Sequence, residues 1–276
     1  MSTARIVTDS AAELSPELIE KLGITVVPWR IHLGSETLLD LPGLRTFSFY
    51  KEMARKKVFP SAQPPTSREF SEAYAQLAKE TDNIVSIHTS SGLARVVQAA
   101  NRGRTGFVGR CQVNLVDSQF ISRALGILVI AAAKAAWEGA SGPEIVRFVH
   151  GMIPRTYFAF HVDNVEYLIS NRLLPDSYRA AARRSRPLLL LEDGEIVALQ
   201  RSRSRGTPIE RLVEFAAEFK SIGRIIILHT GLGPSVEEVK AQLAEVLPMQ
   251  PEEHVYSPVL AAQIGPAALG LVVFEE

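Results

Sequence analysis

Residues 83–102 carry the clearest chemical signal in this chain. A short apolar, β-branched run over residues 84–87 predicts a buried parallel strand, and the polar loop His88-Thr89-Ser90-Ser91-Gly92 follows it. Apolar residues then recur at helical spacing from Leu93 to Ala100. A strand, a hydroxyl-rich loop and a helix N-terminus together suit an anion, because unpaired backbone N–H groups and the helix dipole both favour negative charge.

The same loop has a purely structural interpretation, in which Ser90 or Ser91 only caps the helix. Two further predicted strands have similar endings, Thr8-Asp9-Ser10 and Asp117-Ser118. The carboxyl ends of neighbouring parallel strands share one edge of an open sheet, where ligands bind. We therefore expect the three polar strand ends to line a ligand crevice.

The elements that must position these loops follow from hydrophobic period and capping signals. In the first half we expect strands over 5–8, 24–33, 84–87 and 112–116, an extended connection stiffened by prolines over 58–65, and helices over 15–23, 47–57, 66–80, 93–102, 118–137 and 141–153. In the second half we expect strands over 157–162, 225–228, 256–261 and 269–274, a hairpin over 188–200 turning at Asp193-Gly194, and helices over 165–170, from Thr207 and from Val236.

The change of pattern after Arg155 predicts two α/β domains. Residues 1–156 are expected to form an N-terminal parallel-sheet sandwich. Residues 157–276 are expected to form a C-terminal mixed-sheet domain, with the ligand site between the two. A chain of 276 residues is long enough to bury two such cores.

Composition excludes several classes of protein. Hydrophobic content is 46% and charged content 22%, and 30 basic residues balance 30 acidic ones, so charge gives no case for nucleic acid or a membrane surface. A single cysteine, Cys111, excludes an internal disulfide and fits a cytoplasmic protein. No signal peptide is expected, and the apolar stretch 124–137 contains Lys134 and is too short for membrane insertion.

Motifs for a metal or a cofactor are not expected. The six histidines lack ligand spacing, and His88 and His229, at strand ends, are expected to be structural. No phosphate-binding loop or nucleophile elbow is present, and the glycines of 103–109 indicate a turn. A basic run is expected to be a solvated face or, alternatively, a docking patch for an acidic partner or a phosphate; it comprises Arg179, Arg183, Arg184, Arg186, Arg201, Arg203 and Arg205.

Several short motifs, in this order, resemble the DegV family of bacterial fatty-acid-binding proteins with a two-domain α/β fold. They are Thr8-Asp9-Ser10, Val26-Val27-Pro28, Gln63-Pro64, Ser90-Ser91-Gly92-Leu93, Val116-Asp117-Ser118, Glu166-Tyr167-Leu168 and Gly265-Pro266-Ala267-Ala268-Leu269-Gly270. The matches run nearly the full length of the chain. The resemblance thus implies a fatty-acid ligand and a two-domain fold.

The resemblance also implies which residues hold the carboxylate of the acid. The positions fall in the Gln-Pro loop, in the serine loop, after Glu-Tyr-Leu and in the C-terminal glycine segment; the residues are Ser61, Gln63, Ser90, Ser91, Ala94, Arg95, Arg172 and Gln263. Ala94, Arg95 and Gln263 replace the family's Ser, Gly and His. Gln263 can form hydrogen bonds but carries no charge, and a neutral hydrogen bond is roughly half as strong as a charge-assisted one.

The resemblance therefore predicts a cytoplasmic binding protein for a long-chain fatty acid that is not itself an enzyme. In the family such a protein presents the acid to a separate fatty acid kinase, which is the partner implied here. The alternative is an enzyme or sensor for a smaller carboxylate or phosphate anion, with Arg95 filling the head-group pocket.

Overall fold

The computed structural model describes residues 3–55, 59–179, 188–199 and 206–276. The chain divides into two compact units. Unit 1 comprises residues 1–30, 39–42 and 63–154, and unit 2 comprises residues 31–38, 43–62 and 155–276. The domains expected on either side of residue 156 stay a prediction; the contacts also group two earlier segments with unit 2. Arg183, Arg184, Arg186, Arg201, Arg203 and Arg205 of the basic run lie outside the described residues.

Unit 1 is built on a parallel four-stranded sheet. The strand order is β2-β1-β6-β7, and all three neighbouring pairs are parallel. The strands are β1 (Arg5–Asp9), β2 (Thr25–Val27), β6 (Asn83–His88) and β7 (Gln112–Asp117). The central strands are buried on both faces, which explains their near-continuous apolar runs. The parallel-sheet prediction for this part of the chain is confirmed.

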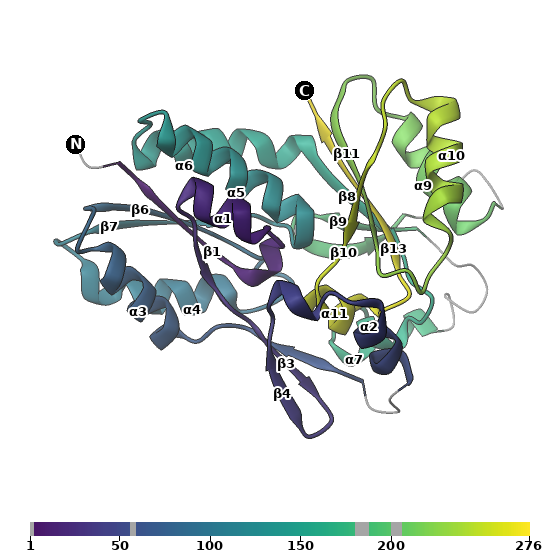
Figure 1. The fold of residues 1–276 in the computed structure, drawn as a ribbon, viewed down its shortest axis with the longest axis horizontal. Coiled ribbons are helices and arrows are strands. Elements are labelled where there is room, and N and C mark those ends of the chain that lie inside the picture. Colours follow the sequence, from purple (N-terminus) through teal and green to yellow (C-terminus); the bar gives the residue numbers. More distant parts are fainter. Residues whose placement is uncertain (1–2, 56–58, 180–187, 200–205) are drawn as a thin grey trace. The chain divides into compact units, whose positions relative to one another are not determined.

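Helices cover both faces of this sheet, so unit 1 has three layers (Figure 1). On one face lie α3 (Ser67–Leu77) and α4 (Val96–Gly103), and on the other lie α1 (Pro16–Leu22), α5 (Ser122–Trp137) and α6 (Gly142–Met152). Ser15 caps α1, and Thr66 with Glu69 forms the expected capping box of α3. The sequence signals thus placed both helix starts correctly.

The residues between β2 and α3 in the sequence form a small sheet with the strand order β4-β3-β5. Its strands are β3 (Arg30–Leu33), β4 (Glu36–Leu39) and β5 (Ser61–Gln63), and α2 (Phe47–Arg55) lies between β4 and β5. The single strand expected over 24–33 is wrong, because the chain leaves β2 at Pro28 and enters a different sheet. Proline cannot donate a ladder hydrogen bond, which favours a break there.

Unit 2 contains a mixed six-stranded sheet with the order β10-β9-β8-β13-β11-β12. Its strands are β8 (Thr156–His161), β9 (Leu189–Glu192), β10 (Glu195–Ala198), β11 (Ile222–His229), β12 (Glu252–Val255) and β13 (Leu269–Glu275). Only β11 and β12 pair in parallel; the other pairs are antiparallel. The hairpin turns at Asp193 and Gly194, both with positive φ, as its sequence predicted. The mixed-sheet prediction is confirmed.

The helices of unit 2 include one that sequence patterns missed. Besides α2, the described residues of unit 2 form α7 (Glu166–Ser170), α9 (Pro208–Ala217), α10 (Val236–Val246) and α11 (Pro258–Ile264). The strand expected over 256–261 is wrong: β12 ends at Val255 and α11 follows. Ser257 caps α11 by accepting a bond from Leu260 N at 3.3 Å, and Pro258 occupies the first helical position. Short 3-10 turns occur at Ser10–Ala12, Pro42–Leu44, Arg104–Phe107 and Ile153–Arg155.

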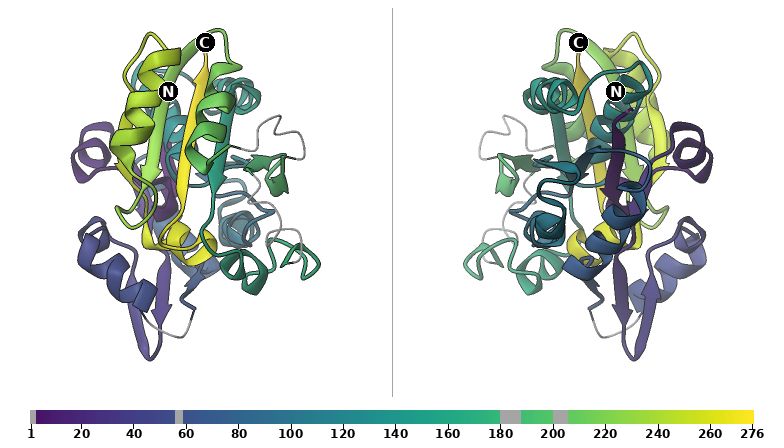
Figure 2. Two further views of the ribbon diagram at one scale, coloured as in Figure 1. Left: turned by 90° about the vertical axis from the view of Figure 1, so that its right-hand side faces the viewer. Right: turned by 90° about the vertical axis from the view of Figure 1, so that its left-hand side faces the viewer.

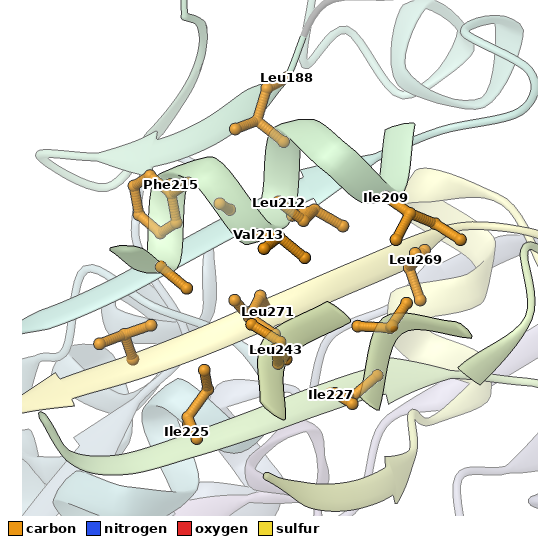
Figure 3. Close-up of a cluster of buried hydrophobic side chains, with 14 residues drawn as sticks. Leu188, Ile209, Leu212, Val213, Phe215, Ile225, Ile227, Leu243, Leu269 and Leu271 are labelled. Carbon is orange, nitrogen blue, oxygen red and sulfur yellow. The ribbon is translucent and has the colours of Figure 1, made fainter. Parts of the chain in front are cut away.

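The core of unit 2 lies between one face of this sheet and two helices. Helices α9 and α10 lie on the near side of the sheet in the left view of Figure 2. Figure 3 shows Leu212 of α9 and Leu243 of α10 directed toward Leu271 of β13 and Ile227 of β11. Close-packed apolar contacts of this kind supply most of the stability of such a unit.

We predict that Leu243→Ala destabilises unit 2 strongly, whereas Val246→Ala on the same helix does not. Leu243 is fully buried in the cluster, and Val246 is 46% exposed. Truncation of a buried leucine costs about 2–5 kcal/mol, because contacts are lost and a cavity remains. Urea denaturation of both variants measures the difference. Equal losses in the two variants would contradict the packing described here.

Candidate functional site

The polar ends of three strands meet at the carboxyl edge of the parallel sheet, as expected. β6 lies between β1 and β7, and His88 pairs in register with Asp117. Asp9 ends β1 and bonds to residues of the next strand. The gathering of these strand ends follows from their parallel order, because each strand delivers its last residue to the same edge.

Asp9 is the centre of a buried hydrogen-bond cluster at this edge. Its Oδ1 accepts bonds from Trp29 Nε1 at 2.8 Å, Thr89 Oγ1 at 2.8 Å and Ala11 N at 3.2 Å. Its Oδ2 accepts from Thr89 N at 3.0 Å and lies 3.1 Å from His88 Nδ1. All of these groups belong to unit 1, and both Asp9 and His88 are fully buried.

The cluster continues through His88 along one face of the sheet. His88 Nε2 lies 2.6 Å from Ser86 Oγ, which lies 2.8 Å from the Tyr74 hydroxyl of α3. Ser86 and His88 share a face because side chains alternate along a strand. Burial raises the pKa of Tyr74, so its hydroxyl remains protonated. The structural role expected for His88 is thus consistent with its two bonded ring nitrogens.

The pKa of Asp9 lies below its ordinary value of 3.8. Burial alone raises this pKa, and the bonds and charge of His88, together with the two donors of Thr89, more than offset that effect. The carboxylate is therefore ionised at neutral pH. A buried charge of this kind is stable only because several donors surround it.

The loop after β6 differs from the sequence prediction. Helix α4 begins at Val96 with Arg95 before it, so neither Ser90 nor Ser91 caps it and Leu93 lies outside it. The buried Ser90 holds the loop: its Oγ accepts from Gly92 N, and its carbonyl accepts from the N–H groups of Leu93 and Ala94, all at 3.1 Å. Ser90 N donates to Phe120 O at 2.9 Å.

The unpaired N–H groups expected in this loop are therefore mostly paired. Ser91 N donates to the Asp117 carboxylate at 3.3 Å, and the N–H of Ala94 is used by Ser90. The exposed side chains that remain are the hydroxyl of Ser91 and the guanidinium of Arg95, which directly precedes α4. Any anion at this loop would thus meet a cation, a hydroxyl and the first turn of a helix.

The remaining predicted site residues lie apart from this loop in sequence. Gln63 belongs to unit 1 and ends β5 at an exposed position. Ser61, Arg172 and Gln263 belong to unit 2. Ser61 begins β5 and is exposed, and Arg172 is exposed with a φ of 59°.

Gln263 differs from these residues because it is buried on α11, with 5% exposure. Its Oε1 has no hydrogen-bond partner among the described residues. The side chain of Asn171 donates to Ala262 O at 2.9 Å, so the neighbour of Arg172 contacts the neighbour of Gln263. The segments that carry Arg172 and Gln263 are thus joined within unit 2.

His229 of unit 2 is nearly buried at the end of β11, and its Nε2 lies 3.0 Å from Glu253 Oε1. Burial lowers the pKa of His229, and the Glu253 carboxylate opposes this only in part. Within the ranges that the structure describes, no three His, Cys, Asp or Glu residues gather in a way that could hold a metal ion. No described helix is both long and apolar enough to cross a membrane.

Three members of the Asp9 cluster were missed at the level of sequence. Trp29 donates from its ring to Asp9 and from its backbone to Ser10 Oγ at 3.0 Å, and Ser86 and Tyr74 extend the cluster. A serine two residues before His88 in an apolar strand was the available signal, because it had to share the face of that histidine. Nothing in the sequence marked Trp29 or Tyr74.

The family model for DegV, described as an uncharacterised protein family, matches residues 3–276. The chain belongs to the DegV family. A DegV domain-containing protein of Streptomyces coelicolor is 31% identical over 277 residues, which cover 97% of each chain. The resemblance seen in the short motifs is confirmed.

Solved structures of DegV proteins share this fold over the whole chain. A DegV family protein from Thermus thermophilus, described by its fatty acid binding, has a TM-score of 0.85 at 24% identity, with 100% of both chains covered. DegV of Bacillus subtilis, a fatty acid binding protein, has a TM-score of 0.84 at 23% identity, again with 100% of both chains covered. These likenesses confirm the α/β fold class.

We predict that Asp9→Asn destabilises unit 1 at neutral pH by at least about 1–3 kcal/mol, because an amide cannot accept from all of these buried donors. The pKa of Asp9 is lower in the folded than in the unfolded chain. Its contribution to stability is therefore complete above about pH 4 and is lost as the pH falls through the folded pKa. Denaturation at pH 7 and at pH 3 measures the change.

The matched control is Glu20→Gln, which neutralises an exposed acid on α1. We expect it to change stability by less than about 0.5 kcal/mol. The difference in free energy of unfolding between Asp9→Asn and the unmodified protein should be smaller at pH 3 than at pH 7. An equal difference in free energy of unfolding at both pH values would show that the ionised carboxylate does not stabilise this edge.

Proposed function

We propose that this DegV family protein binds a long-chain fatty acid and does not itself catalyse a reaction. The observation that carries the proposal is the shared fold, over the full chain length, with DegV proteins described as fatty acid binding. The proposed head-group residues are Ser61, Gln63, Ser90, Ser91, Ala94, Arg95, Arg172 and Gln263. We further propose a cytoplasmic location, which its single, buried cysteine fits.

The tail of the acid supplies most of the proposed binding free energy. Each buried CH₂ group contributes about 0.8 kcal/mol, so a palmitoyl chain outweighs any one polar contact. The head-group loop then fixes the orientation of the bound acid. This division is consistent with a loop whose N–H groups are largely paired within the protein, because a weak head site is sufficient when the tail is long.

Denaturing mass spectrometry of the purified protein tests the proposal. We expect a co-purifying fatty acid or, after delipidation, uptake of added palmitate or oleate. Absence of both would contradict a role in fatty-acid binding.

A smaller carboxylate or phosphate anion is the second candidate ligand, for an enzyme or sensor. It is favoured by the exposed Arg95 beside the first turn of α4, because a guanidinium suits either anion. A thermal-shift screen of fatty acids against small phosphates and carboxylates separates the two. Stabilisation by small anions alone would favour the second candidate.

We predict that Ser61→Ala weakens fatty-acid binding by about 0.5–1.5 kcal/mol, the net free energy of one hydrogen bond. Ser61 begins β5 between Pro60 and Pro64, so its hydroxyl is placed by a stiff segment and little ordering entropy is lost on binding. Calorimetric titration with palmitate measures the effect. Ser71→Ala on α3 is the control and should leave affinity unchanged; an equal effect in both variants would remove Ser61 from the site.

We also propose that the protein presents its acid to a separate fatty acid kinase, and that it does so poorly. Ala94 and Gln263 stand where the family carries Ser and His. If those positions orient the carboxylate, the altered geometry reduces phosphoryl transfer by about 10²-fold, because positioning is a large part of such catalysis. Burial of the tail depends on neither side chain, so affinity should change less than phosphoryl transfer.

We predict that the double variant Ala94→Ser, Gln263→His increases acyl-phosphate formation more than it increases affinity. Kinase assays and palmitate titrations on the same preparations measure the two effects. A relative that carries both family residues, assayed with the same kinase, is the reference. Equal activity of the unmodified protein and that relative would contradict the proposed loss of transfer.

A further inference from the structure

Unit 1 contains a surface pocket at the amino edge of its parallel sheet, opposite the edge that carries Asp9. The strands β6 and β7 both begin at this amino edge, where Asn83 pairs in register with Gln112. The pocket is lined by the end of α4, the turn after it and the start of β7, together with Asp82 before β6. Its volume of about 650 Å³ lies within the range of small-molecule sites.

Two arginines line this pocket. Arg104 is held in place, because its Nε donates to Asn101 Oδ1 at 2.9 Å and its Nη1 donates to Val113 O at 2.8 Å. Both acceptors are neutral, so they do not balance its charge. The side chain of Arg110 is exposed and has no hydrogen-bond or ion-pair partner among the described residues. Asp82 is the only acid in the described lining, so the pocket carries a net positive charge.

Apolar side chains lie beside these charges. Val113 and Cys111 are buried, whereas Val108 is 85% exposed, and all three line the pocket. Burial and the nearby Asp82 carboxylate raise the pKa of the Cys111 thiol, so this cysteine is protonated at neutral pH and behaves as a small apolar side chain. A ligand in this pocket therefore meets positive charge and apolar carbon together.

We propose that this pocket binds a small organic anion that joins an oxyanion group, either a phosphate monoester or a carboxylate, to an apolar body. Exposed arginines usually form a solvated surface. Here Arg104 is fixed by two hydrogen bonds, and a preformed guanidinium binds an oxyanion at a lower entropic cost than a mobile one. None of the proposed head-group residues lines the pocket, so this site is separate from the proposed fatty-acid site.

Titrations with phenyl phosphate, benzoate, inorganic phosphate and benzyl alcohol test the proposal. Each compound is followed by NMR at low salt, because salt screens exposed charges. We expect saturable binding of phenyl phosphate or benzoate, and the tighter of the two identifies the oxyanion. Phenyl phosphate should bind at least about fivefold more tightly than inorganic phosphate, because only its ring buries apolar surface. Benzyl alcohol should bind at least about tenfold more weakly than the preferred anion, because it has no charge to pair with a guanidinium.

Three variants assign the binding to this pocket. Arg110→Gln should weaken binding of the preferred anion about tenfold, and it should leave the fold intact because the side chain has no partner to lose. Val108→Ser should weaken binding of phenyl phosphate but not of inorganic phosphate. The matched control is Arg102→Gln, at an exposed arginine of α4 outside the lining, which should change affinity less than about twofold. Thermal melts establish that each variant folds.

The titrations are run on the delipidated protein and on the protein with one equivalent of palmitate. Absence of saturable binding by both organic anions would overturn the proposal. Equal losses in Arg110→Gln and Arg102→Gln would also overturn it, because general surface charge would then explain the binding. Displacement of the anion by palmitate would place the anion at the fatty-acid site, which would overturn this inference and leave the proposed function intact. Failure of palmitate to bind, with anion binding retained and sensitive to Arg110→Gln, would support this inference and overturn the proposed function.

Discussion

The burial of one ionised carboxylate constrains the carboxyl edge of unit 1. Asp9 is held by groups from the turn after β1, from the end of β6 with the loop that follows it, and from the segment after β2, so that edge is well formed only when all three segments are in place. Because the cost of an unpaired buried charge is large, the cluster favours one arrangement of these strand ends over any other. Two hydrogen bonds to Asp9 hold Thr89 in place, and Thr89 directly precedes Ser90 and Ser91 in the loop.

The polar residues at this edge therefore divide into two groups with different roles. Among the buried ones, Asp9 and His88 interact with each other, and Ser90 bonds to the backbone of its own loop. Those left exposed, Ser91 and Arg95, are available to a ligand. Hydroxyl groups at a strand end can thus serve to stabilise the edge of the sheet, and only the exposed ones can contact a ligand.

The sequence predicted most of the secondary structure and the adjacency of the three strand ends, because periodicity and capping are local signals. The prediction was wrong where contacts between distant segments determine the local structure. Pro28 separates what was expected to be one strand into strands of two sheets. Residues 256–261 are in part aromatic and β-branched, yet a helix capped by Ser257 begins at Pro258. The pairing of loop N–H groups by Ser90 and the bond from Trp29 to Asp9 join distant residues, and no local pattern contains them.

The proposed function requires that the protein hold the head of a long-chain acid at a defined site. Carbon-13 NMR of palmitate labelled at its carboxyl carbon, added to the delipidated protein, tests this most directly. We expect one narrow resonance, distinct from those of free and micellar palmitate, that saturates at one equivalent of acid. A spectrum that contains only the free and micellar signals would contradict it.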